Sequence, residues 1–145
     1  EETADQERVH AKQFLKRLEG GEVEIAVSFF AGTVGTTAQN LESAANGERH
    51  EHGSLYPSFA EVAKREGFDD IAALYRCIAV AERLHERRFA ALLERVRNGT
   101  SQIREAPVTW VCEKCGYTFE GKEPPPKCPA CGHPRNHFEQ LADNW

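Results

Sequence analysis

The chain has 145 residues, a net charge of −5, and 28% charged and 40% hydrophobic residues, a composition typical of folded globular proteins. The acidic balance provides no overall basic surface for nucleic acid. No apolar run approaches the ~20 residues of a membrane-spanning helix, and the chain does not begin with a signal-peptide pattern. We therefore expect neither a nucleic-acid partner nor a membrane partner.

The first predicted element is a helix over residues 1–19, with a possible capping box from Thr3 to Gln6 and a stop at Gly20-Gly21. Residues 22–36 are rich in β-branched residues and glycine and lack helical periodicity, which predicts an extended crossover. Methionine is absent, even at residue 1, so we expect the numbered chain to start somewhere other than a native initiator.

A second helix is predicted from Thr36 or Thr37 to about Glu66, where Gly67 ends it. Pro57 lies inside this segment. Because proline lacks the backbone N–H and clashes with the preceding turn, it predicts a kink or a break.

A third helix is predicted from about Asp69 to Arg97, closed by Asn98-Gly99. Residues 100–109 form a polar linker, and from Trp110 onward proline, glycine, cysteine and aromatic residues replace the helical pattern. We therefore predict a helical domain over residues 1–99 and a small metal domain over residues 110–145.

Ionisable residues occupy positions on the apolar stripes of all three predicted helices. The steps of three and four that define each stripe continue straight through them, so they share a face with the leucines and phenylalanines around them. They are Glu7, His10, Glu48, Glu51, Glu82 and His85.

Buried carboxylates that converge in an apolar core need a compensating cation, because an unpaired buried charge is costly. Two of the pairs have the Glu-x-x-His spacing of carboxylate-bridged di-iron bundles, in which one turn separates the two ligands. A single such pair is usually a solvated helix face. Three pairs within apolar stripes on separate helices favour a two-metal site.

Four of the five cysteines form two CxxC turns separated by twelve residues, each followed by a glycine. Four thiolates at this spacing predict a tetrahedral site for iron or zinc. Aromatic residues at 110, 117, 119 and 138 can enclose it, and the fifth cysteine, Cys77, has no assigned role. Metal-bound thiols favour a reducing compartment, the cytoplasm. The four are Cys112, Cys115, Cys128 and Cys131.

Four segments, together with the cysteine pattern, resemble the rubrerythrin family. They are ADQERVHAK at residues 4–12, GERHE at 47–51, YPSFA at 56–60 and AVAERLHE at 79–86. The resemblance covers nearly the whole chain. It implies a mainly α protein with a ferritin-like four-helix bundle and a C-terminal rubredoxin-like iron domain.

The resemblance also implies a ligand set for two irons. Glu7 and Glu82 bridge them, Glu48 and His85 serve one, and Glu51 and His10 exchange at the other. Tyr56 matches a family tyrosine beside the metals. The family's first helix, which carries a further glutamate ligand, has no counterpart here, so we expect a further helix outside the numbered chain. His52 stands where the family usually has tyrosine, which puts one outer hydrogen bond in doubt.

The function implied by the resemblance is reduction of hydrogen peroxide to water. Electrons would arrive through the tetracysteine iron from an external donor protein or an NAD(P)H-dependent reductase, in a head-to-tail homodimer. Two other classes stay open. An iron-oxidising detoxification protein of ferritin type would not need the cysteine domain, and a zinc-ribbon binding module would not need glutamates on core stripes.

Overall fold

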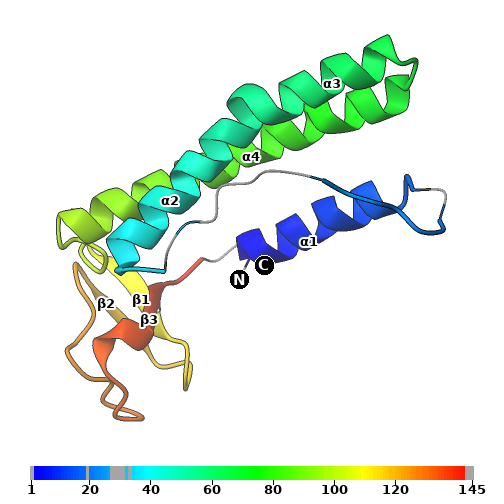
Figure 1. Cartoon of the computed structure of the whole chain (residues 1–145). Helices are drawn as coiled ribbons and strands as arrows, with labels where there is room; N and C mark the ends of the chain where they lie inside the picture. Colours follow the sequence, from blue (N-terminus) through cyan, green and yellow to red (C-terminus); the bar gives the residue numbers. More distant parts are fainter. Residues whose placement is uncertain (1, 19, 27–31, 33, 143–145) are drawn as a thin grey trace. The chain divides into compact units, whose positions relative to one another are not determined.

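The computed structural model describes residues 2–18, 20–26, 32 and 34–142. The chain divides into two compact units, the helical unit Glu1–Leu93 and the cysteine unit Glu94–Trp145 (Figure 1). The predicted crossover over residues 22–36 lies partly outside the described residues, and residues 22–26 contain neither helix nor strand. Our division into 1–99, 100–109 and 110–145 stays a prediction.

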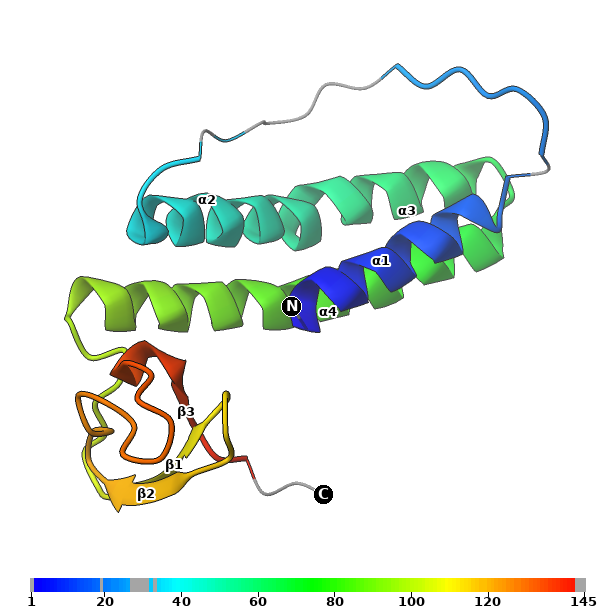
Figure 2. The ribbon, with the colours of Figure 1, turned by 90° about the horizontal axis from the view of Figure 1, so that it is seen from below.

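The helices of the described residues form three separate segments. The first is α1 (Glu2–Leu15). The second is a continuous arm of α2 (Thr37–His50), the π-helical turn η1 (Glu51–Leu55) and α3 (Tyr56–Arg65). The third is the long helix α4 (Asp69–Arg97), whose bounds confirm the predicted ones. The arm runs alongside α4, as both views show (Figure 2).

The capping box occurs at the start of α2 rather than at α1. Thr36 Oγ1 accepts a hydrogen bond from the Gln39 backbone N–H at 3.3 Å, and Gln39 Oε1 accepts one from the Thr36 N–H at 2.9 Å. The capping box predicted at Thr3 is wrong. Thr3 lies inside α1, where its hydroxyl accepts a hydrogen bond from Arg88 of α4.

The predicted kink or break at Pro57 is realised as the π-helical turn immediately before it. The Tyr56 N–H reaches back five residues to the carbonyl of Glu51. Pro57 then lies in the first turn of α3. Backbone N–H groups in the first turn of a helix have no partner within that helix, so proline is tolerated there. The Ser54 hydroxyl donates to the His50 carbonyl at 3.0 Å, on the helical turn that leads into η1.

The core of the helical unit is built from alanines and a small aromatic cluster. Phe14 of α1 lies with its ring centroid 6.0 Å from Tyr56 and 5.5 Å from Tyr75, so α1 packs against both α3 and α4. The helices can approach one another closely because most of their buried apolar residues are small alanines. The buried apolar residues are Ala45, Tyr56, Ala60, Ala63, Ala72, Ile78 and Ala79.

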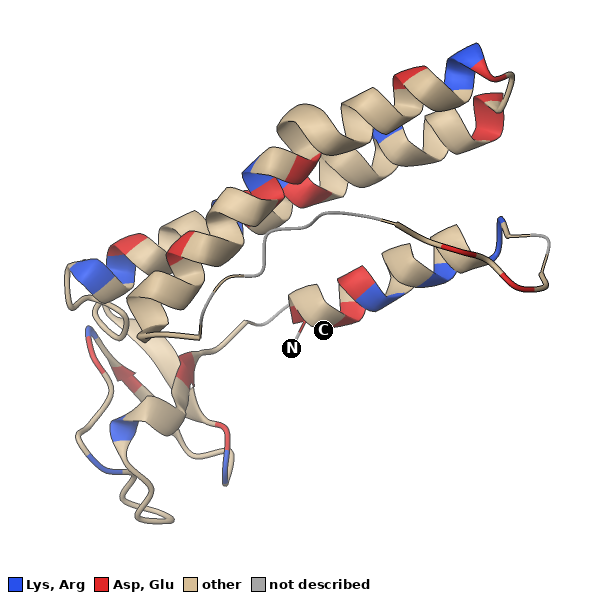
Figure 3. Cartoon of the chain, viewed as in Figure 1, with Lys and Arg blue, Asp and Glu red and all other residues tan. Residues whose placement is uncertain are grey.

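Some large apolar residues of α3 and α4 are not buried. Phe59, Val62 and Leu92 keep 41%, 39% and 42% of their surface exposed. Charged residues of both signs occur on each of the four α-helices (Figure 3). Among the described residues, no helix combines the length and apolar character that a membrane crossing requires.

The cysteine unit is a three-stranded antiparallel sheet in the order β2-β1-β3. Its strands are β1 (Val108–Cys112), β2 (Thr118–Gly121) and β3 (Phe138–Gln140). The predicted aromatic shell is confirmed, because Trp110 and Phe138 are buried with two of the cysteines and Tyr117 and Phe119 pack against them. The Trp110 indole N–H donates to the Gly121 carbonyl at 2.9 Å, which closes the shell.

The segment between α4 and the sheet is tied to the cysteine unit. The Arg104 N–H bonds to the Lys122 carbonyl at 2.8 Å, and the Gln102 amide donates to the carbonyl of Phe138 at 3.1 Å. The Arg104 guanidinium lies 4.9 Å from the centroid of the Trp110 ring, a cation–π contact. Residues 102–104 therefore pack as part of the cysteine unit.

Candidate metal centres

Four of the predicted ligands converge inside the helical unit. Glu7 of α1, Glu48 of α2, and Glu82 and His85 of α4 each place a ligand atom within 4.8 Å of the others. Glu82 and His85 are 0% and 1% exposed, although they are polar. The i, i+3 spacing on α4 directs both side chains to the same face, as predicted.

His85 presents an unprotonated nitrogen to this cluster. Its Nε2 lies 2.9 Å from Gln6 Oε1, an acceptor, so Nε2 carries the proton. Burial also lowers the pKa of His85, which keeps the ring neutral. Its Nδ1 lone pair then points at Glu82 Oε2 at 2.7 Å and Glu7 Oε1 at 2.8 Å. Such an arrangement of lone pairs is suited to a metal ion at their centre.

The missing hydrogen-bond partners of the cluster also favour a metal ion at its centre. Within the described part of the chain, five buried atoms of the cluster have no donor–acceptor partner. Acceptors facing acceptors are unstable without a proton or a cation between them. The donor set of three carboxylates and an imidazole suits iron, so the residues fit a metal centre. The five atoms are Glu7 Oε1, Glu48 Oε2, both Glu82 oxygens and His85 Nδ1.

His10 extends the cluster along α1. Its Nδ1 lies 3.2 Å from Glu7 Oε2 and 3.1 Å from Glu82 Oε1, the oxygens that do not face His85. Its ring centroid lies 6.0 Å from that of His85. Glu7 and Glu82 therefore each have one carboxylate oxygen facing His85 and the other facing His10.

Glu51 and Tyr56 lie beside the cluster rather than within its closest group. Burial, followed by the nearby Glu7 carboxylate, raises the pKa of Glu51, and a hydrogen bond from Tyr56 opposes that shift. Burial, followed by the charge of Glu51, raises the pKa of Tyr56 well above its usual value, so its hydroxyl stays protonated and can donate. The η1 turn thus carries one more carboxylate at the edge of the cluster.

In the metal-free protein, protons take the place of the cation. Burial and repulsion from Glu7 raise the pKa of Glu48 to about 7 and that of Glu82 to about 9. The folded protein therefore binds more protons than the unfolded chain between about pH 5 and about pH 9. The free energy of unfolding must fall as pH rises through that window.

We accordingly expect the Tm of chelator-treated protein to drop by several degrees from about pH 5.5 to about pH 8.5. Calorimetry on metal-free and iron-loaded samples measures this. The iron-loaded protein should show the smaller dependence, because its ligands are already deprotonated. A metal-free Tm that is flat or rises over this range would contradict the assignment of buried, protonated carboxyls.

The four cysteines form a second cluster. Sγ of Cys112 lies 3.7 Å from Sγ of Cys131, and Sγ of Cys115 lies 3.7 Å from that of Cys128, with all four sulfurs within 4.8 Å of one another. The fifth cysteine, Cys77, is exposed.

Each CxxC turn closes around a positive-φ glycine. Gly116 and Gly132 have φ of 75° and 77°, and their N–H groups bond to the carbonyls of Cys112 and Cys128. Burial alone would raise the pKa of the Cys128 thiol, but backbone N–H donors from Cys131 and Ala130 lower it to about 7. These backbone donors favour the thiolate form of Cys128.

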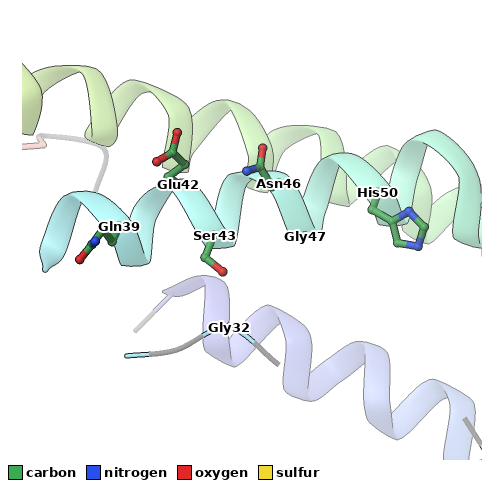
Figure 4. Close-up of a pocket in the computed structure, with 7 residues that line it drawn as sticks. All are labelled: Gly32, Gln39, Glu42, Ser43, Asn46, Gly47 and His50. Carbon is green, nitrogen blue, oxygen red and sulfur yellow. The ribbon is translucent and has the colours of Figure 1, made fainter. Parts of the chain in front are cut away.

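Two pockets of the helical unit differ in their relation to the cluster. One of about 540 Å³ is lined by Glu7 and Glu48 together with apolar residues of α2 and α4, including Phe89. The other, of about 560 Å³, lies on α2 and contains none of the predicted ligands (Figure 4). His50, at its end, pairs with Ser54 rather than with a carboxylate.

Sequence reasoning missed Gln6, which sets the tautomer of His85 from another helix. The residue lies inside the ADQERVHAK segment, but no spacing rule links it to a position 79 residues away. It also missed the contacts of His52 and Arg49 with Glu86.

Both the helical unit and the cysteine unit match known protein families. A family model described as rubrerythrin matches residues 1–93, and one described as the rubredoxin-like domain of rubrerythrin matches residues 110–139. The chain is 49% identical over 144 residues to rubrerythrin of Nitratidesulfovibrio vulgaris and 50% identical to that of Porphyromonas gingivalis. Each match covers 99% of this chain. It covers 75% of the Nitratidesulfovibrio vulgaris protein and 72% of the Porphyromonas gingivalis protein.

A solved structure of nigerythrin in a mixed-valence state is 26% identical, with a TM-score of 0.49; the match covers 91% of this chain and 61% of that one. The family models and the two curated relatives decide the assignment. This chain therefore belongs to the rubrerythrin family and is an iron protein, with a ferritin-like di-iron unit and a rubredoxin-like tetracysteine unit.

Proposed function

We propose that this protein is a peroxidase that reduces hydrogen peroxide to two waters with two electrons and two protons. The observation that carries the proposal is the convergence of Glu7, Glu48, Glu82 and the unprotonated Nδ1 of His85, in a chain that also holds four sulfurs as a second metal site. A protein that only bound or stored iron would have no need of that electron-transfer site.

In the assignment we propose, Glu7 and Glu82 would serve both irons, Glu48 and His85 would hold one, and Glu51 and His10 would hold the other. The irons would supply two electrons and the Lewis acidity for O–O cleavage.

The protein itself would provide a route for peroxide to the irons and hold the ligand side chains in place. The pocket beside Glu7 and Glu48 can admit a small molecule such as peroxide, and Ala44 and Phe89 make its wall apolar. The Tyr56 hydroxyl, which keeps its proton, donates to Glu51 and orients that carboxylate.

Electrons would enter through the iron held by Cys112, Cys115, Cys128 and Cys131. An external donor protein or an NAD(P)H-dependent reductase would refill it. We propose a head-to-tail homodimer as the working form and the reducing cytoplasm as its location, in protection against oxidative stress.

The test is a rapid-mixing experiment on anaerobically reduced protein. Hydrogen peroxide should oxidise the tetracysteine iron, seen as the red ferric tetrathiolate absorption, with two electrons consumed per peroxide. Dioxygen at equal concentration is the comparison. Faster oxidation by dioxygen than by peroxide, with ferric iron accumulating in the protein, would favour a ferritin-type iron oxidase instead.

A further inference from the structure

Glu86 joins α2 and η1 to α4 through two short contacts. Its Oε1 accepts from Arg49 Nε at 2.6 Å, and its Oε2 lies 2.6 Å from His52 Nε2. The side chains of Glu86 and His52 are only 19% and 17% exposed, so the pair is largely withdrawn from solvent. We call Arg49, His52 and Glu86 the Glu86 clamp.

The clamp adjoins the proposed ligands along the sequence on both helices. His52 directly follows Glu51, and Glu86 directly follows His85. One carboxylate therefore ties together the two backbone segments that carry a ligand for each proposed iron.

His52 also lies in η1, where the backbone leaves regular α-helical geometry. A π-helical turn is rare and frequently lies at a functional site. The wider turn is fixed against α4 by the side chain of His52, whereas the neighbouring His50 pairs with Ser54 of its own arm. The clamp is thus a link from η1 to α4 that lies outside the metal cluster.

We propose that the Glu86 clamp is a positioning device for the di-iron centre: it holds η1 against α4 and so sets where the Glu51 carboxylate lies relative to His85. The proposal rests on the ligand assignment above. Residues that orient metal ligands through hydrogen bonds typically change metal affinity 10- to 100-fold when they are removed. The clamp should therefore govern mainly the ion that Glu51 serves.

The test compares His52→Phe and Glu86→Ala with wild type and with Arg87→Gln, a control at an exposed neighbour of Glu86. The measurements are iron per chain during timed chelation, the electron paramagnetic resonance signal of the mixed-valence pair, and the Tm of the metal-free protein. In both clamp variants we expect one of the two bundle irons to be lost about 10-fold faster, with an altered mixed-valence signal. The control should match wild type.

His52→Gln keeps an N–H donor and should restore much of the retention, and it also serves if His52→Phe fails to fold. Retention and signal like those of wild type in both clamp variants would overturn the proposal. So would a lowered Tm of the metal-free protein with iron binding unchanged, because the clamp would then be structural only. Wild-type protein that binds no iron in the bundle would instead refute the proposed function.

Discussion

Replacing Glu82 with alanine is expected to remove the iron of the helical unit and leave the tetracysteine iron in place. Glu82 is fully buried, and its two oxygens face His10 and His85 at 3.1 and 2.7 Å. No other described carboxylate stands between both imidazoles with no exposure to water. Without it, the remaining acidic groups lack both a bridge and enough cation to balance them.

Elemental analysis of anaerobically purified protein measures the result. Iron per chain should fall to the single cysteine-bound ion, and thermal stability should fall with it, since ligand binding stabilises the folded state. Glu61→Ala is the matched control, because Glu61 is an exposed glutamate on α3. Full retention of bundle iron in Glu82→Ala would remove the basis of the proposed site.

The features predicted well from the sequence are local ones. The bounds of α4 follow from its caps and periodicity, and the cysteine unit follows from two CxxC turns with their glycines and aromatic residues. The clustering of Glu7, Glu48, Glu82 and His85 was predictable because a carboxylate on an apolar stripe must point where leucine would.

The features that could not be predicted depend on tertiary geometry. The π-helical turn η1 needs the competition between Pro57, the helix ladder and packing against α4, which no propensity scale contains. The bonds from Gln6 to His85 and from His52 to Glu86 join residues 79 and 34 positions apart. The exposure of Phe59 and Val62 depends on what surrounds the helices, which periodicity does not report.

A second large effect is expected from mixed dimers, if electrons cross between subunits. His85 lies twelve residues before the end of α4 at Arg97, which at ~1.5 Å per residue is roughly 18 Å along the helix. The cysteine unit follows that end of the helix. A head-to-tail dimer would let the cysteine-bound iron of one subunit serve the di-iron site of its partner, and a two-fold arrangement forms both contacts at once.

The first hybrid pairs a Cys112→Ser subunit with a Glu82→Ala subunit, each of which should be inactive as a homodimer. With transfer between subunits, the intact cysteine site of one chain serves the intact di-iron site of the other, and peroxide turnover should return to about half that of wild type, since one of the two equivalent pairs remains.

The reciprocal hybrid pairs a wild-type subunit with one carrying both substitutions. It contains the same number of intact sites, but in a crossed dimer each intact site faces a broken one, so this hybrid should be inactive. Transfer within a chain predicts the reverse for both hybrids. Because the two hybrids hold identical metal inventories, differing only in how the intact sites are distributed, iron content cannot account for a difference in turnover. An active reciprocal hybrid beside an inactive first one would show that each chain feeds its own di-iron site.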